Sequence, residues 1–396
     1  MTSEIFDWER AHEAAHALRE QGAVHQVTLP SGVGAWVIGH HADALAALTD
    51  ERLSKDSAGM HRILGAQLRR AGKPPELSRM FGSSSILFMD NPRHDELRRR
   101  VSKAFTLRRV HLLRPGIERL VAGLLEDLPR DRPVDLIEHL AFPLPLAVIC
   151  ELLGIPLDER DQFRDWTTAL MEDEPDRVLP ASHAMEDYFD KLIVAKRTSA
   201  DDGLLSAMVQ LSDIGELTAD EVMDLVFLLF VAGHETATNL IGNGVYHLLA
   251  DPRRWRLLGR RPDLVPGAVE EVLRFDSPVR MATYRWTTEP VQYGGVIIPA
   301  EQVVLVSLLS AGRDQHRYPD ADRLDVRRNA THLSFGHGIH YCLGTPLARL
   351  EADIAFTALT REFPDARPAV ETDELHHNPS VIMNGFRSLP VILGGR

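Results

Sequence analysis

The sequence predicts a mainly helical protein with small β-sheets near the N-terminus and in the C-terminal half. Apolar residues recur at three- and four-residue spacing through most of the chain, whereas alternating or β-branched apolar runs are short and few. The 396-residue sequence contains no Gly/Ser-rich tract, fixed-period repeat or long single-sign charge block that would mark a linker between domains. We therefore expect a single large helical domain over residues 1–396.

Helical spacing is found in segments distributed along the whole chain. Residues 219–249 form the longest and most apolar of these segments. Further helices are expected at 42–48, 95–105, 115–128, 136–153, 158–170, 184–196, 264–274 and 346–363.

Strand signals are local and are grouped around turn residues such as Pro30-Ser31-Gly32, Gly294-Gly295 and Asn384-Gly385. Residues 53–87 and 167–182 are rich in Gly, Pro, Ser and charge, so we expect mobile loops there, either binding lids or plain surface excursions. Strands are expected at 24–29, 35–38, 284–288, 296–298, 303–307, 381–383 and 389–393.

The charge balance is acidic. A formal charge of −13 and an isoelectric point near 5.8 disfavour sequence-independent nucleic-acid binding, which needs a basic surface. A basic cluster is the exception and is either a solvated helix face or a docking patch for an acidic partner. Its members are Arg98, Arg99, Arg100, Lys103, Arg108, Arg109 and Arg114.

Cysteine content and hydropathy bear on the compartment. The two cysteines, Cys150 and Cys342, form no disulfide framework, which favours an intracellular protein. The first ten residues lack a basic region followed by an apolar one, and the longest apolar stretch, 225–232, is far shorter than the ~20 residues that span a bilayer. We expect a cytoplasmic protein without a membrane anchor.

The stretch 334–344 has the spacing Phe-x-x-Gly-x-x-x-Cys-x-Gly around Cys342. Glycines let a main chain approach a flat ligand closely, and a helix expected to start at 345–346 would lower the pKa of the thiol and favour the metal-binding thiolate. Alternatives are an inert buried cysteine and a zinc site that adds His337 and His340, although structural zinc usually needs four ligands in paired spacings.

This stretch resembles the cysteine-ligand loop of the cytochrome P450 superfamily. The phrases at 150–156 and 269–278 are similar to those of the soluble bacterial class that includes macrolide and vitamin D hydroxylases. The resemblance implies that Cys342 is the axial ligand of the iron of haem b (Fe-protoporphyrin IX). It also implies contacts to the haem from Phe335, Gly336 and Gly344.

Glu271 and Arg274 are three residues apart and share a helix face, which alone is more typical of a surface salt bridge. In this context they resemble the Glu-x-x-Arg pair of the family. The resemblance implies a buried network that Arg328 completes and that holds the loop presenting Cys342.

The segment 231–236 places a glycine and a carboxylate inside the most apolar expected helix, and both are costly there. The purely structural interpretation is that the Thr236 hydroxyl donates a hydrogen bond to the carbonyl of Ala232 and bends the helix. The segment resembles the family's acid-alcohol motif, which implies an oxygen-binding groove at Ala232 and Gly233. Glu235 and Thr236 are then the catalytic residues that supply protons to bound oxygen.

His94 and Arg98 are four residues apart and point the same way on a helix that begins after Asn91-Pro92. Alone, they are a surface pair. With Arg285 and His340 they resemble the cationic contacts of the family to the two haem propionates.

The family resemblance implies a haem-thiolate monooxygenase that inserts one oxygen atom of O2 into a C–H bond, by hydroxylation or epoxidation. The expected substrate is a large lipophilic molecule such as a macrolide or other polyketide of secondary metabolism. Electrons are expected from NAD(P)H through a ferredoxin reductase and a ferredoxin, which the basic cluster would suit as a docking surface. We expect a monomer without a nucleic-acid or membrane partner.

Substrate contacts implied by the resemblance are mostly apolar. Arg280 departs from this pattern and would face solvent or a carboxylate. An acidic run is either a solvated helix end or an anchor for a cationic substrate group such as an amino sugar; it comprises Glu172, Asp173, Glu174 and Asp176. The pocket residues are Phe227, Val231, Val279, Arg280, Met281, Ile382 and Met383.

Other functions remain open at this stage. The same fold could act on a steroid or terpenoid, or catalyse oxidative coupling. A non-catalytic haem sensor would not need Glu235 and Thr236, and a peroxide-driven enzyme would be expected to lack the pair.

Overall fold

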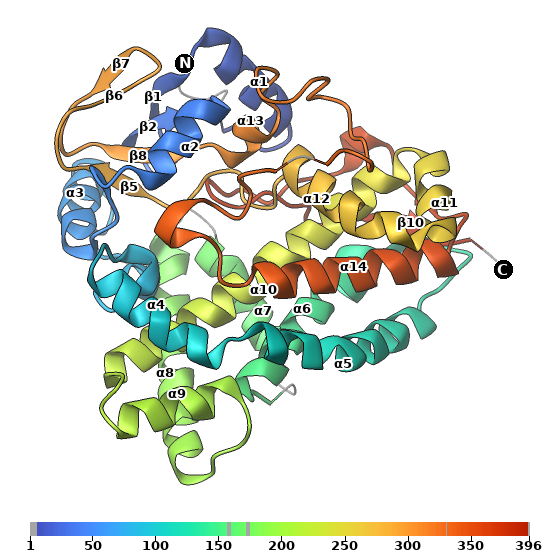
Figure 1. Ribbon diagram of the computed structural model, residues 1–396, viewed down its shortest axis with the longest axis horizontal. Coiled ribbons are helices and arrows are strands. Elements are labelled where there is room, and N and C mark those ends of the chain that lie inside the picture. The colour runs from blue at the N-terminus through green and yellow to red at the C-terminus, as the bar shows by residue number, and fades with distance from the viewer. Residues whose placement is uncertain (1–5, 157–159, 172–174, 330, 395–396) are drawn as a thin grey trace.

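The computed structural model describes residues 6–156, 160–171, 175–329 and 331–394. Helix α10 (Ala219–Leu249) runs through the middle of the molecule (Figure 1) and begins at a capping box between Thr218 and Glu221. It is long and apolar enough to cross a membrane, but 67% of its most apolar window is buried inside the protein. It is therefore the core helix, and the expected helix at 219–249 is confirmed.

Other helices pack directly against α10 and enclose it. The contacts come from α6 (Pro143–Leu153), α8 (Pro175–Thr198), α12 (Val265–Phe275) and α14 (Thr345–Glu362), among others. The remaining helices are α1 (Ala11–Gln21), α2 (His41–Thr49), α3 (Ser57–Arg70), α4 (Arg93–Ala104), α5 (Leu107–Glu126), α7 (Arg160–Met171), α9 (Leu204–Asp213), α11 (Pro252–Arg260) and α13 (Leu308–Gly312).

The larger sheet lies beside the helical body, near the N-terminal helix α1 (Figure 1). Its order is β1-β2-β8-β5-β3, with β1 and β2 antiparallel and β2 parallel to β8. A second sheet has the order β4-β10-β9, and β6 pairs with β7. The strands are β1 (Val24–Thr28), β2 (Gly34–Ile38), β3 (Leu53–Ser54), β4 (Val134–Asp135), β5 (Arg285–Thr287), β6 (Val291–Tyr293), β7 (Val296–Ile298), β8 (Val303–Val306), β9 (Arg367–Pro368) and β10 (Pro390–Ile392).

The mainly helical fold class is confirmed, but some expected helices have different bounds, such as the one at 184–196, which is part of the longer α8. Helix α5 starts at Leu107 instead of 115, because the Thr106 hydroxyl caps it by accepting from the Arg109 amide, and Pro115 lies inside the helix. The expected helix at 136–153 is divided into a π-helical turn, η3 (Ile137–Ala141), and α6.

The two loops expected at 53–87 and 167–182 are largely wrong. The first contains β3, α3 and the short 3₁₀ turns η1 (Arg79–Phe81) and η2 (Ile86–Phe88). Most of the second belongs to α7 and α8, and residues 172–174 lie outside the described residues.

Of the last expected strand pair, the strand at 389–393 is confirmed as β10, but its expected partner and their pairing are wrong. Residues 381–383 form no strand, and Met383 makes only an isolated bridge to Val279. Strand β10 pairs with β4 and β9, which come from other parts of the chain.

Candidate functional site

The loop that carries Cys342 is folded back on itself by its own backbone. The Cys342 amide donates to the Phe335 carbonyl at 2.9 Å, and the Gly336 amide donates to the Leu333 carbonyl at 2.7 Å. Gly336 and Gly338 have φ values of 73° and 74°, which favour glycine. The resulting tight turn presents the cysteine immediately before α14.

The Cys342 side chain is accessible on the protein surface. A Cβ placed on Gly344 would lie 3.7 Å from its sulfur, which is an ordinary contact distance, so Gly344 adjoins the sulfur directly. Desolvation by the surrounding protein raises the pKa of the Cys342 thiol, against the lowering effect of the Gly344 and Thr345 amides and of Arg98. The amides at the helix start thus act in the expected direction, and desolvation opposes them.

The zinc alternative at His337, His340 and Cys342 is not supported. Within the described part of the chain, the side chains close enough to share a metal are instead His12, His247 and Asp276. In that group Asp276 accepts a hydrogen bond from each histidine ring, at 2.9 and 2.8 Å, and lies far along the chain from Cys342.

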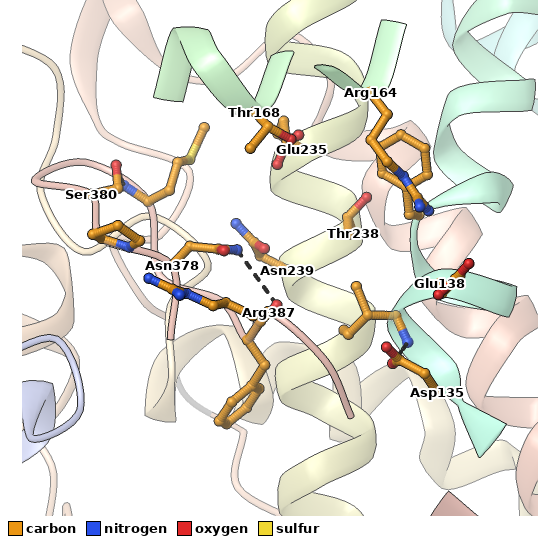
Figure 2. Close-up of a pocket in the computed structure, with 15 residues that line it drawn as sticks. Asp135, Glu138, Arg164, Thr168, Glu235, Thr238, Asn239, Asn378, Ser380 and Arg387 are labelled. Carbon is orange, nitrogen blue, oxygen red and sulfur yellow. Dashed lines mark hydrogen bonds between the residues drawn. The ribbon is translucent and has the colours of Figure 1, made fainter. Parts of the chain in front are cut away.

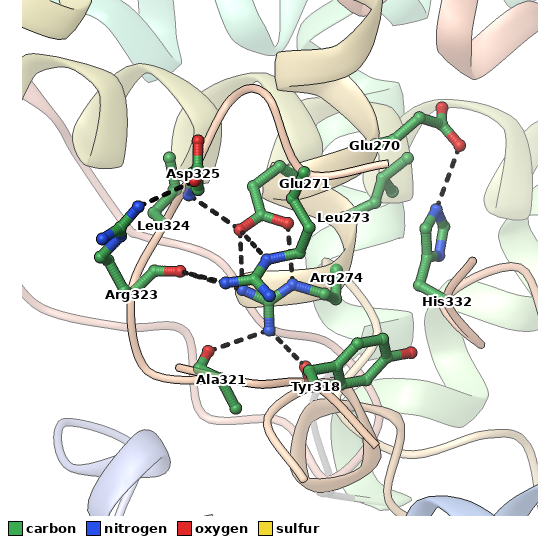
Figure 3. A network of polar contacts seen from close by, with 12 residues as sticks. Glu270, Glu271, Leu273, Arg274, Tyr318, Ala321, Arg323, Leu324, Asp325 and His332 are labelled. Carbon is green, nitrogen blue, oxygen red and sulfur yellow. Dashed lines mark hydrogen bonds and ion pairs between the residues drawn. The ribbon is translucent and has the colours of Figure 1, made fainter. Parts of the chain in front are cut away.

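A buried ionic network lies behind the cysteine loop (Figure 3). Both carboxylate oxygens of Glu271 accept from Arg274 at 2.8 Å, and Arg328 Nε donates to Glu271 at 3.1 Å. The Arg274 guanidinium also donates to the carbonyls of Gly312 and Ala321. The three residues expected to form this network are therefore together, and the side chain of Arg274 is 0% exposed.

The sequence did not single out Glu270, the neighbour of this network. Glu270 accepts from Arg349 of α14 at 2.6 and 2.7 Å and contacts His332, which precedes the cysteine loop, at 3.3 Å. Partial burial opposes ionisation, but these two partners lower the pKa of Glu270 to about 2. The Ser334 hydroxyl also donates to the Leu273 carbonyl at 2.5 Å, so α12 holds both ends of the loop.

The four predicted cationic contacts are gathered beside the cysteine loop. The rings of His94 and His340 are 4.5 Å apart, and Arg98 donates to the Tyr341 carbonyl at 2.6 Å. Arg285 is buried and donates to two backbone carbonyls. Burial together with the positive charges around it lowers the pKa of His340.

This cation cluster fits a ligand with two carboxylates. His340 Nε2 and Arg285 Nε are buried without a hydrogen-bond partner in the described structure, which is costly unless an acceptor binds there. Lys55, which the sequence analysis did not single out, adds a further positive charge to the cluster. An accessible thiol beside such a cluster has the donor chemistry expected for an iron-bearing ligand with two propionates.

The α10 segment named from the sequence is partly explained by packing. Ala232 is exposed although most of α10 is buried, which leaves open a surface for a flat ligand. The Thr236 hydroxyl donates to the Ala232 carbonyl at 2.9 Å, as the purely structural interpretation predicts. Helix α10 continues through this segment without a break. A Cβ on Gly233 would lie 2.8 Å from Ile149, so this glycine admits α6.

Glu235 lines a cavity of about 240 Å³ beside α10 (Figure 2). Thr238 Oγ1 is buried without a partner beside this cavity, and His234 Nε2 lies 3.6 Å from the Glu235 carboxylate. The cavity combines acids, arginines and amides and suits ordered water. Its lining includes Asp135, Glu138, Arg164, Thr168, Glu235, Thr238, Asn239, Asn378, Ser380, Met383 and Arg387.

The predicted substrate pocket residues fall into two groups. Phe227 and Val231 are buried in the main apolar core. The segments 279–281 and 381–383 lie side by side, because the Arg280 amide donates to the Ile382 carbonyl at 2.8 Å, but of these residues only Met383 lines the cavity of Figure 2.

Arg280 does not face solvent, so the first of its two expected environments is wrong, whereas the carboxylates of Asp276 and Glu9 do act on its charge. It is 3% exposed, its guanidinium donates to the Met383 carbonyl at 3.0 Å and to Asn384 Oδ1 at 3.3 Å, and it lies over the Trp8 ring. Of the predicted acidic run, Glu172, Asp173 and Glu174 lie outside the described residues.

Comparison with known proteins gives matches along the whole chain. A family model described as Cytochrome P450 matches residues 263–384. Vitamin D(3) 25-hydroxylase of Pseudonocardia autotrophica is 42% identical over 98% of this chain and 95% of its own length. 6-Deoxyerythronolide B hydroxylase of Saccharopolyspora erythraea is 37% identical over 98% and 96%. The tirandamycin C-bound P450 monooxygenase TamI superposes with a TM-score of 0.91 at 41% identity, covering 97% of this chain and 98% of TamI.

Proposed function

Because the chain belongs to the cytochrome P450 family and is a monooxygenase of that family, we propose that Cys342 ligates the haem iron. We further propose that the substrate is a large lipophilic molecule, such as a macrolide or another polyketide of secondary metabolism. The named substrate of 6-deoxyerythronolide B hydroxylase and the tirandamycin C bound by TamI support this class. A steroid-like substrate is the second candidate, supported by the 42% identity to vitamin D(3) 25-hydroxylase.

The observation that carries the proposal is the accessible Cys342 thiol beside a cluster of buried cations. Either feature alone would be weak support for a haem site. Together they offer one soft ligand for iron and several charge-assisted donors for carboxylates. His94, Arg98, Arg285 and His340 would hold the haem propionates.

Haem b, when bound, supplies a redox-active iron that allows one atom of O2 to be inserted into a C–H bond. The contribution of Cys342 is electron donation from its sulfur, which requires the thiol proton to leave. Glu271, Arg274 and Arg328 fix the backbone behind the loop and so fix the direction of that sulfur.

Proton supply is the proposed task of Glu235 and Thr236. The Glu235 carboxylate faces the polar cavity, so it can take up a proton from water there and pass it toward the other face of α10. The Thr236 hydroxyl can release the Ala232 carbonyl and donate to an oxygen atom bound beside it.

Electrons would come from NAD(P)H through a ferredoxin reductase and a ferredoxin, with this chain acting as a cytoplasmic monomer. The basic cluster supplies a surface for an acidic ferredoxin, since Arg99, Lys103 and Arg108 are exposed. Leu107 and Leu112 are 62% and 70% exposed beside them, which gives this surface an apolar centre.

The reduced carbon monoxide complex tests the iron ligand. We expect the red-shifted absorption band of thiolate-bound haem in the wild type and its loss in Cys342→Ser, because a hydroxyl is a poor substitute for the thiolate. Cys150→Ala is the control and should keep the band. A wild type without the band would overturn the proposal.

The substrate class is tested separately by titrating the oxidised protein with macrolactones and with vitamin D3. A substrate that displaces water from the iron shifts the haem spectrum from low to high spin. We expect the larger shift and the oxygenated product with a macrolactone, and the opposite preference would favour the second candidate.

A further inference from the structure

Lys55 directly follows β3 in the sequence. It belongs to the cation cluster, although the sequence analysis did not identify it. The residue is 1% exposed, and its ammonium donates a hydrogen bond to the Thr283 hydroxyl. Its Nζ also lies 5.0 Å from the centre of the Phe88 ring. A buried ammonium held by one hydroxyl and one ring is incompletely paired.

Asp90 favours the charge of this ammonium, but its carboxylate is engaged by other donors. The side chain of Asp90 accepts from Ser54 Oγ at 2.5 Å and from the backbone amide of Lys55 at 3.0 Å, and no hydrogen bond from Nζ to Asp90 is found in the described structure. Asp90 therefore fixes the backbone at Lys55 while the ammonium extends elsewhere.

The ammonium lies close to the cations proposed to hold the haem, because the carbonyl of Leu53, two residues before Lys55, accepts a hydrogen bond from Arg285 at 3.3 Å. Lys55 and Arg285 repel one another, and burial together with this repulsion lowers the pKa of Lys55 well below its usual range. The charge of Lys55 also acts to lower the pKa of His94. A buried lysine in this position destabilises the folded protein unless an anion binds to the cluster.

We propose that Lys55 is a further positive charge for the haem propionates, with Thr283 and Phe88 positioning its ammonium. This inference rests on the proposed function, because it needs haem beside Cys342. Lys55 is a positioning and neutralising residue in this role, and it contacts neither oxygen nor substrate.

The test compares binding of haem and of haem dimethyl ester, whose carboxylates are blocked, to the full-length apoprotein. In the wild type, haem should bind more tightly than the ester. In Lys55→Met, that preference should fall by roughly tenfold, because one charge-assisted contact to a carboxylate is lost. Lys55→Arg retains the charge and should retain most of the preference.

A purely structural role for Lys55 predicts a different result. Lys55→Met would then weaken haem and its ester equally, and an unchanged preference would overturn the proposal. Lys191→Met, at an exposed lysine of α8, is the matched control. If Lys55→Met yields no folded apoprotein, Lys55→Gln takes its place with the same expected loss of preference.

The reduction potential provides a second readout. Loss of a nearby positive charge should make the potential of Lys55→Met more negative than that of the wild type, and an equal potential would count against the proposal. A wild type that lacks the thiolate band with carbon monoxide would overturn the proposed function itself. A normal band with an unchanged ester preference would overturn only the role of Lys55.

Discussion

The hydroxyl of Thr236 has one proton to donate, and it donates it to the Ala232 carbonyl. In the proposed mechanism this proton is redirected to oxygen during turnover. In Thr236→Ala, the fraction of consumed NAD(P)H that yields product should fall at least about tenfold, because the proton donor is lost. Product and NAD(P)H measured in the same reaction check this expectation. Thr198→Ala, at an exposed position, is the control, and equal coupling in Thr236→Ala would remove the proposed role.

Glu271 is a second single residue whose replacement can be tested, in this case through the stability of the folded protein. Replacement by alanine leaves the buried Arg274 guanidinium without its carboxylate, which should cost about 3–5 kcal/mol of unfolding free energy. Urea unfolding of the folded protein measures this loss. Glu289→Ala removes a carboxylate that is 61% exposed and should change stability by less than about 0.5 kcal/mol. Equal effects of the two substitutions would contradict the structural role of the network.

At the scale of elements, Glu270 connects α12, α14 and the segment before the cysteine loop. Its pKa is held near 2 in the folded protein, against an ordinary value of 4.5. A carboxyl whose pKa is lower in the folded state stabilises the fold fully above pH 4.5 and progressively less as the pH falls toward 2. Glu270→Gln should therefore be less stable than the wild type at pH 7.

The difference between these two proteins should narrow as the pH falls below 4.5, because the wild type then loses the same ion pairs. Urea unfolding at a series of pH values measures the difference. Glu289→Gln is the control and should follow the wild type throughout. A constant difference between wild type and Glu270→Gln would show that the ion pairs of Glu270 do not stabilise the fold.

The long apolar helices were predictable because tertiary packing and local spacing agree in them, as in α10. Helix α3 was taken for a loop because glycines interrupt its pattern. A Cβ on Gly59 would lie 2.2 Å from the Trp286 ring, so the glycine is required by a residue far along the chain. Pro115 and Pro180 lie inside α5 and α8, where local rules place helix starts.

The parts of the candidate site that belong to recognised sequence motifs were predicted. The structure brings together the Glu271 network, and it gathers the four cations beside the cysteine loop, as the family resemblance implies, while their contacts to haem stay a prediction. Lys55 and Glu270 escaped notice, because one lies in a segment taken for a loop and the other is a second glutamate beside the recognised one. Their roles depend on contacts that only the folded chain brings together.

For the whole molecule, the proposed docking of an acidic redox partner depends on a basic cluster within a chain of formal charge −13. Arg108→Glu should slow association with an acidic ferredoxin by roughly tenfold at low salt, and high salt should reduce the difference by screening. Stopped-flow reduction of the haem by ferredoxin measures the rate. Arg260→Glu, on α11, changes the net charge equally. If both variants slow association alike, overall charge and not the cluster guides the partner.

The network around Arg274 also constrains the order in which the chain can fold. The carbonyls of Gly312, Ala321 and Arg323 that accept from this guanidinium lie 38 to 49 residues later in the sequence. During synthesis, α12 therefore leaves the ribosome well before the residues that complete its hydrogen bonds. The ion pair with Glu271 can form within the helix itself, but the remaining hydrogen bonds of the Arg274 guanidinium must wait until that later segment has emerged.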